Sequence, residues 1–284
     1  MKKQAIMLFH GLWSTPTEFG FMVKLLKAKG FDVLTPQART YGQCDDGPLT
    51  TTYHDWINEV RDLYLNAKKE YETVYVSGLC IGSSLALALA ALPDFDSEND
   101  MIFSLSATMH FDGWDIPFAG EYLFKGFYFF HRYFNLMPNW RYVEDAPYGI
   151  KDPKMQRLIR MSFRNMTKSE EDSYATPARY VHQALKLGKY LKKNLQKITA
   201  PLLICHAKED ETASPRNACI IENLVSSAIS RKVLLKNSYH MITLDSERER
   251  LAHEISHFIA FVNEMRSSRD VKQKQEANRN QLAA

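Results

Sequence analysis

The chain has 284 residues, of which 45% are hydrophobic and 24% charged, and its formal net charge is +3. This size and composition are sufficient for a full hydrophobic core and are typical of one globular domain. Residues 1–265 hold 31 basic and 31 acidic side chains, so no nucleic-acid partner is expected. No apolar run reaches the ~18 residues of a membrane-spanning helix.

Short apolar or β-branched runs alternate with helical patterns along the chain. Six runs are predicted to be strands, near residues 5–9, 31–35, 73–77, 101–106, 201–206 and 231–236. This alternation predicts an α/β fold with a mainly parallel sheet and helices on both faces.

The first strand run leads into the loop H-G-L-W, residues 10–13, and then into S-T-P, which is typical of a helix start. A helix is predicted from there to about Lys29. We interpret His10 as a side chain that supports this loop through hydrogen bonds, not as a catalytic base.

The most informative segment is V-Y-V-S-G-L-C-I-G-S-S-L-A-L, residues 74–87. A β-branched run ends in G-x-C-x-G and passes directly into an Ala/Leu-rich helix. This pattern is typical of a nucleophile elbow, in which a sharp, strained turn presents the nucleophile and glycines allow strand and helix to approach closely. The helix N-terminus favours negative charge at the same place. Cys80 is the predicted nucleophile; the alternative is a glycine-rich turn with a buried cysteine.

Residues from about 110 to 195 separate the fourth and fifth strand runs and are predicted to form an inserted cap. Twelve of the thirty residues from 111 to 140 are aromatic. This density favours an apolar pocket for an acyl chain or ring, with Phe129 and Phe130 in its wall. The alternatives are aromatic side chains that only pack the cap onto the core, and a cap that makes peripheral contact with a membrane surface.

Two later loops hold the candidate acid and base. The segment A-K-E-D-E-T-A-S-P, residues 207–215, contains Glu209, Asp210 and Glu211, and N-S-Y-H-M-I-T-L-D, residues 237–245, contains His240. An acid followed by a histidine is the chain order that accompanies an elbow of this kind. Asp210 and His240 are the predicted pair, and spacing alone leaves Glu209 and Glu211 open as the acid.

On these residues the chain resembles the bacterial carboxylesterase and monoacylglycerol lipase group of α/β-hydrolases. The resemblance covers residues 5–110 and 195–265 and rests on three motifs, which are D-x-x-x-x-P (Asp210 to Pro215), S-x-H-x-I-T-L-D (Ser238 to Asp245) and Asp55-Trp56. It implies an α/β-hydrolase fold with an inserted cap.

The resemblance also bears on the site. It implies Asp210 as the acid, because the acid of this group stands five residues before that proline. The fold implies backbone amides of Leu12 and Ile81 as the oxyanion hole. The group uses a serine nucleophile, and Cys80 departs from this. Cysteine elbows of this form are similar to those of dienelactone hydrolases and polyhydroxyalkanoate synthases.

These features predict a hydrolase that cleaves carboxylic ester or thioester bonds through an acyl-enzyme on Cys80. One alternative is an acyltransferase or synthase that passes the acyl group to an alcohol or a second thioester. The other is a non-catalytic binding protein, although that would predict loss of the acid or the base. No cofactor or metal is expected, and the partner is a small acyl ester or thioester. The oligomeric state is not predicted.

The remaining cysteines are Cys44, Cys205 and Cys219, which show neither close pairing nor metal-ligand spacing. Cys205 and Cys219 lie in apolar patterns and are expected to be core thiols, and free thiols favour a cytoplasmic location. Residues 266–284 hold five basic and two acidic side chains and few apolar ones. We predict a domain over residues 1–265 and a disordered polar tail over residues 266–284.

Overall fold

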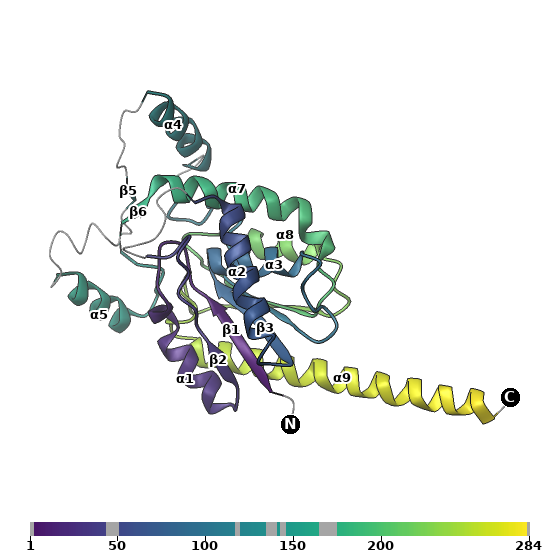
Figure 1. Ribbon diagram of the computed structural model, residues 1–284. Helices are drawn as coiled ribbons and strands as arrows, with labels where there is room; N and C mark the ends of the chain where they lie inside the picture. Colours follow the sequence, from purple (N-terminus) through teal and green to yellow (C-terminus); the bar gives the residue numbers. More distant parts are fainter. Residues whose placement is uncertain are drawn as a thin grey trace.

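A six-stranded sheet forms the centre of the molecule (Figure 1). The computed structural model describes residues 3–43, 51–116, 120–134, 141–142, 146–164 and 175–282. The strands are β1 (Gln4–Phe9), β2 (Asp32–Leu34), β3 (Thr73–Leu79), β4 (Ile102–Leu105), β7 (Leu202–Ala207) and β8 (Ser230–Leu235). Their order is β2-β1-β3-β4-β7-β8, and every neighbouring pair is parallel. The six predicted strands and the α/β class are confirmed.

Helices cover both faces of this sheet because its strands are apolar on both sides. In β3, Val74 and Val76 pack into one core and Tyr75 into the other, as the two-residue period of a strand requires. The first core lies under α2 (Tyr53–Ala67), α3 (Ile81–Ala90), α7 (Ala178–Asn194) and α8 (Arg216–Leu224). The second lies under α1 (Gly20–Ala28), which the 3-10 helix Pro16–Phe19 precedes, and under the N-terminal part of α9 (Arg248–Leu282).

The predicted insertion lies between β4 and β7. It contains α4 (Gly120–Phe134), α5 (Pro153–Arg164) and a small antiparallel pair, β5 (Arg141–Tyr142) with β6 (Thr176–Pro177), before α7. In Figure 1, α4 and α5 project from the layered body, whereas α7 lies along it. The insertion therefore begins at the C-terminal end of β4, and α7 leads the chain back to the sheet at β7.

The predicted domain boundary at residue 265 falls inside the terminal helix. The terminal helix α9 continues to Leu282 and projects beyond the body (Figure 1). At the predicted boundary, the guanidinium of Arg266 donates hydrogen bonds to the carbonyl oxygens of Asn99 and Asp100, at 2.7 and 3.3 Å. None of the helices within the described ranges has the length and apolar character needed to cross a membrane.

Candidate active site

Cys80 lies at the turn between β3 and α3 in a backbone conformation that is rare for a residue with a side chain. Its φ is 57° and its ψ is −118°. The flanking glycines explain how the turn closes. A Cβ on Gly82 would lie 2.0 Å from the carbonyl oxygen of Phe9, and a Cβ on Gly78 would lie 2.4 Å from the carbonyl carbon of Gly82. The turn therefore has the strained, glycine-dependent geometry that the G-x-C-x-G pattern predicts.

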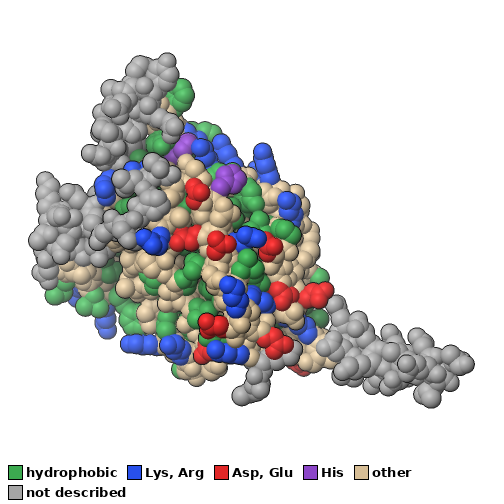
Figure 2. Space-filling model, viewed as in Figure 1, with side chains coloured by type: hydrophobic (Ala, Val, Ile, Leu, Met, Phe, Trp, Pro, Cys, Tyr) green, Lys and Arg blue, Asp and Glu red, His purple; other side chains and the backbone are tan. Residues whose placement is uncertain are grey.

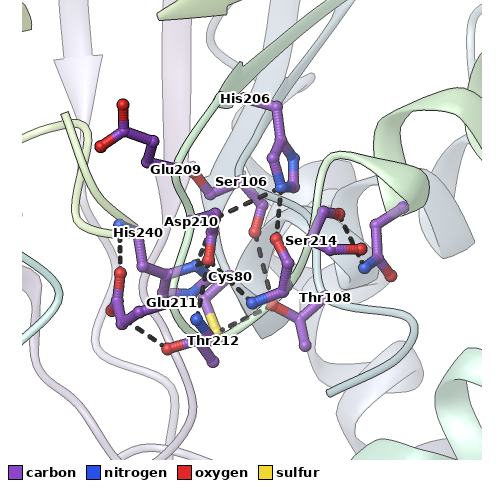
Figure 3. Close-up of polar contacts among 12 residues, drawn as sticks. Cys80, Ser106, Thr108, His206, Glu209, Asp210, Glu211, Thr212, Ser214 and His240 are labelled. Atoms are coloured by element: carbon purple, nitrogen blue, oxygen red, sulfur yellow. Dashed lines mark hydrogen bonds and ion pairs between the residues drawn. The ribbon is translucent and has the colours of Figure 1, made fainter. Parts of the chain in front are cut away.

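Asp210 and His240 form a direct pair, although they come from the loops after two different strands. The ring Nδ1 of His240 lies 2.9 Å from Oδ1 and 2.8 Å from Oδ2 of Asp210. Asp210 Oδ1 also accepts the N–H groups of Thr212 and Ala213, at 3.0 and 2.7 Å. Figure 3 shows this pair beside Cys80. Both side chains are buried, so the carboxylate fixes the orientation of the ring.

The two neighbouring carboxylates have different places. Glu209 is exposed and forms a 2.8 Å ion pair with Lys151. Glu211 is buried, and its Oε2 accepts the backbone N–H of His240 at 3.0 Å. Of the three carboxylates in this loop, Asp210 is the one that contacts the His240 ring, whereas Glu211 holds the backbone of the His240 loop.

The pKa values of the pair reflect their mutual attraction. Burial alone would lower the pKa of His240, but the charge of Asp210, with a smaller contribution from Cys80, raises it well above the usual 6.5. Burial alone would raise the pKa of Asp210, but His240 and then His206 hold it well below its usual value. The other ring nitrogen of His240, Nε2, is buried, and Cys80 interacts with the same ring. That nitrogen is available for proton transfer.

The loop after β1 lies against the elbow, since a Cβ on Gly11 would be 3.7 Å from the Cβ of Cys80. The N–H of Gly11 donates to Oε1 of Glu18 at 2.9 Å, and the N–H of Trp13 donates to the carbonyl oxygen of Tyr41 at 2.9 Å. Both neighbours of Leu12 therefore have their amides engaged.

The two predicted oxyanion amides are placed differently. Among the described residues no acceptor is found for the N–H of Leu12. Ile81 is the first residue of α3, where N–H groups have no partner within the helix.

His10 has the supporting role that the sequence predicts. Its Nε2 accepts the N–H of Ala38 at 3.0 Å, and its Nδ1 lies 2.9 Å from the carbonyl oxygen of Gly11. Burial lowers the pKa of His10 to about 4, against small opposing effects of Gly11 and Glu59. His10 is therefore a neutral side chain with both nitrogens engaged, and it holds the loop in place.

Two residues beside the site were not identified from the sequence. His206, at the end of β7, lies 3.3 Å from Oδ2 of Asp210 and 2.7 Å from the carbonyl oxygen of Ala213, both measured from Nε2. Its position four residues before Asp210 was a usable signal. The hydroxyl of Thr108 lies 3.4 Å from the sulfur of Cys80. No motif marks Thr108 in the sequence.

The other cysteines are only partly as predicted. Cys80, Cys205 and Cys219 are all free thiols. Cys205 is fully buried, and burial raises its pKa. The expectation of a core thiol is wrong for Cys219, which is only partly buried and lies 3.5 Å from Nζ of Lys232, because α8 turns this residue toward β8 and solvent. Cys44 lies outside the described residues.

The predicted pocket wall is not supported at Phe129, whose side chain is 64% exposed. The reason is that α4 projects from the body and turns one face to solvent. Its neighbour Tyr128 is buried and stacks on His182 with ring centroids 4.3 Å apart. The side chain of Phe130 lies outside the described residues. In the described part of the chain, no group of three or more His, Cys, Asp and Glu side chains could hold a metal ion.

Comparison with known proteins shows the family of the chain. The family model described as "Serine aminopeptidase, S33" matches residues 1–247. A thermostable monoacylglycerol lipase of Bacillus sp. (strain H-257) is 27% identical over 256 residues, which are 90% of each chain. A carboxylesterase of Bacillus subtilis (strain 168) is 22% identical over 257 residues, which are 90% of this chain and 92% of the relative.

Solved structures agree in fold. A soluble variant of monoglyceride lipase from Saccharomyces cerevisiae, in complex with a substrate analog, has a TM-score of 0.70 at 14% identity and covers 90% of this chain and 86% of its own. A monoacylglycerol lipase of Paleococcus ferrophilus has a TM-score of 0.65 at 14% identity, with 90% and 93% covered.

Proposed function

The chain belongs to the serine aminopeptidase S33 family of α/β-hydrolases, and on this premise we propose that it hydrolyses carboxylic esters through a covalent thioester on Cys80. One observation carries the proposal. Cys80 at its strained turn lies beside His240, whose ring is held by Asp210 at 2.8 Å. A nucleophile, a base and a group that orients the base are the minimum set for acyl transfer.

The reaction follows from the place of each group. Nε2 of His240 takes the thiol proton, and the thiolate of Cys80 attacks the ester carbonyl. The amides of Leu12 and Ile81 stabilise the oxyanion, and His240 returns the proton to the leaving alcohol. A water molecule activated by His240 then hydrolyses the thioester and releases the acid. Asp210 holds the tautomer of His240 and stabilises its protonated form throughout.

The relatives support an ester of a lipid type as the substrate class. The Bacillus relatives are named as a monoacylglycerol lipase and a carboxylesterase. The cysteine supports a second candidate, acyl transfer to an alcohol or a second thioester, because thiol–thioester exchange is nearly thermoneutral. In the described part of the chain Cys80, Cys205 and Cys219 are free thiols, which supports a reducing, cytoplasmic location.

Helix α5 supports peripheral contact of the cap with an anionic lipid surface. Leu158 and Met161 are each 60% exposed, and Lys154, Arg157 and Arg160 on the same helix are also exposed. Figure 2 shows hydrophobic and basic side chains together at this end of the molecule. Exposed apolar side chains among cations are the pattern of a helix that lies in a membrane interface.

The reaction is tested on p-nitrophenyl esters and acyl-CoA thioesters of graded chain length, with and without an alcohol acceptor. Ester hydrolysis should be lost in Cys80→Ala and retained in the control Cys219→Ala. Full activity of Cys80→Ala would overturn the proposal. Acyl-alcohol products that exceed the free acid would favour the transferase.

The lipid contact is tested by co-sedimentation with anionic phospholipid vesicles. A double variant, Leu158→Ser with Met161→Ser, should lose binding and keep the parent rate on a soluble acetyl ester. Phe261→Ser, which removes an exposed apolar side chain from α9, is the control and should bind like the parent. Equal binding of all three proteins would contradict the contact.

A further inference from the structure

Thr108 is a buried residue, 1% exposed, in the loop that follows β4. The elbow holds its backbone on both sides. Its N–H donates to the carbonyl oxygen of Cys80 at 3.4 Å, and its own carbonyl oxygen accepts the hydroxyl of Ser84 at 2.9 Å. Ser106, two residues earlier, has a φ of 44°, which turns the chain toward the elbow. The position of Thr108 is therefore tied to that of the nucleophile.

The side-chain hydroxyl of Thr108 has two possible partners. Its Oγ1 lies 3.4 Å from the sulfur of Cys80 and 3.4 Å from the carbonyl oxygen of Ser106 (Figure 3). A hydroxyl carries a single proton, so it can donate to only one of these acceptors at a time. Which acceptor it uses depends on whether the sulfur carries a proton.

The thiol and the thiolate of Cys80 use this hydroxyl differently. A thiol can donate its S–H to Oγ1 of Thr108, while the hydroxyl donates to Ser106. A thiolate has no proton and is an acceptor only, so the hydroxyl can donate to it. A hydrogen bond to an ionised acceptor is about twice as strong as one between neutral groups. The contact therefore stabilises the thiolate more than the thiol.

Resting on the function proposed above, we propose that Thr108 is a further catalytic residue, which donates a hydrogen bond to the Cys80 thiolate. When the S–H bond breaks, its proton passes to Nε2 of His240. The hydroxyl keeps its own proton and changes acceptor from the Ser106 carbonyl to the sulfur. The same donation stabilises the thiolate when the C–S bond of the acyl-enzyme breaks during hydrolysis.

The test is the rate at which iodoacetamide alkylates Cys80, followed by peptide mass spectrometry at pH 6.0 and pH 9.0. Thr108→Val removes the hydroxyl at nearly constant shape and should slow alkylation about tenfold at pH 6.0. The loss should be smaller at pH 9.0, which is above the ordinary thiol pKa of ~8.5. Thr108→Ser keeps the hydroxyl and should behave like the parent, and kcat/KM for a soluble ester should follow the same order.

Two controls make the outcome specific. Ser77→Ala removes a buried hydroxyl of β3 that donates to Phe103 and does not contact the sulfur, so it should leave the rate unchanged. Thr108→Ala replaces Thr108→Val as the hydroxyl-free variant if the circular dichroism spectrum of Thr108→Val differs from that of the parent. Equal rates for the parent and the hydroxyl-free variant at pH 6.0 would overturn the proposal, and so would an equal loss at both pH values. Hydrolysis that survives complete alkylation of Cys80 would instead overturn the nucleophile assignment.

Discussion

The imidazole of His240 faces both carboxylate oxygens of Asp210, with Nδ1 at 2.9 and 2.8 Å. The two adjacent carboxylates, Glu209 and Glu211, do not share this contact. One is paired with Lys151 at the surface, and the other accepts a backbone N–H. Each of the three carboxylates can be replaced by its amide, which removes one negative charge from the same loop. Only the substitution of Asp210 changes the group that contacts the His240 ring.

We expect Asp210→Asn to lower kcat on the order of 10⁴-fold, as loss of the acid does in the Ser-His-Asp template. Glu209→Gln should leave kcat within the same order of magnitude, because its ion pair is exposed. Glu211→Gln keeps an oxygen that can accept the N–H of His240 and should have an intermediate effect. Steady-state kinetics on one soluble ester measures all three, and equal losses would contradict the assignment of Asp210.

The close packing at the elbow predicts that substitution of Gly82 lowers the stability of the fold. Gly82→Ala places a methyl group 2.0 Å from the carbonyl oxygen of Phe9, so the backbone must move. We expect a loss of about 3 kcal/mol in the free energy of unfolding, measured in urea. Gly20→Ala is the matched control, because a Cβ there meets no atom within 4 Å, and it should be neutral or slightly stabilising. A Gly82→Ala protein as stable as the parent would contradict the close approach of α3 to the end of β1.

The burial of His10 predicts that the stability of the fold depends on pH. Its pKa is lowered to about 4 by burial, whereas the unfolded chain titrates near ~6.5. Above pH 6.5 the side chain is neutral in both states and the shift has no effect. As the pH falls, the unfolded state takes up the proton first, so roughly 3 kcal/mol of stability is lost between pH 6.5 and pH 4.

His10→Gln keeps an acceptor for the N–H of Ala38 but cannot titrate. The difference in unfolding free energy between parent and variant should therefore shift in favour of the variant as the pH falls from 7.0 to 4.5. A constant difference over this range would contradict the buried, neutral state of His10. The variant should also retain ester hydrolysis, because His10 has no role in proton transfer.

The features that the sequence predicts correctly have local signals. The buried strands are short apolar runs, and G-x-C-x-G between a strand and a helix specifies the turn at Cys80 because only glycine fits beside it. The choice of Asp210 among three carboxylates was not local. It depended on the family resemblance, and of the three carboxylates Asp210 is the one that contacts the His240 ring.

The features that the sequence misses depend on contacts between distant segments. Thr108 reaches Cys80 because β4 lies beside β3 in the sheet. The sequence of that loop does not predict the order of the strands. The exposure of Phe129 depends on how α4 leaves the body, which aromatic composition does not specify.

Cys80 is proposed to carry the acyl group, and mass spectrometry of the acyl-enzyme identifies the residue that does. The protein is mixed with p-nitrophenyl butyrate, quenched in acid during the first turnovers and digested for peptide mass spectrometry. One butyryl group is expected in the parent, on the peptide that contains Cys80. Hydrolysis that proceeds with the butyryl group on another residue would contradict the assignment of Cys80.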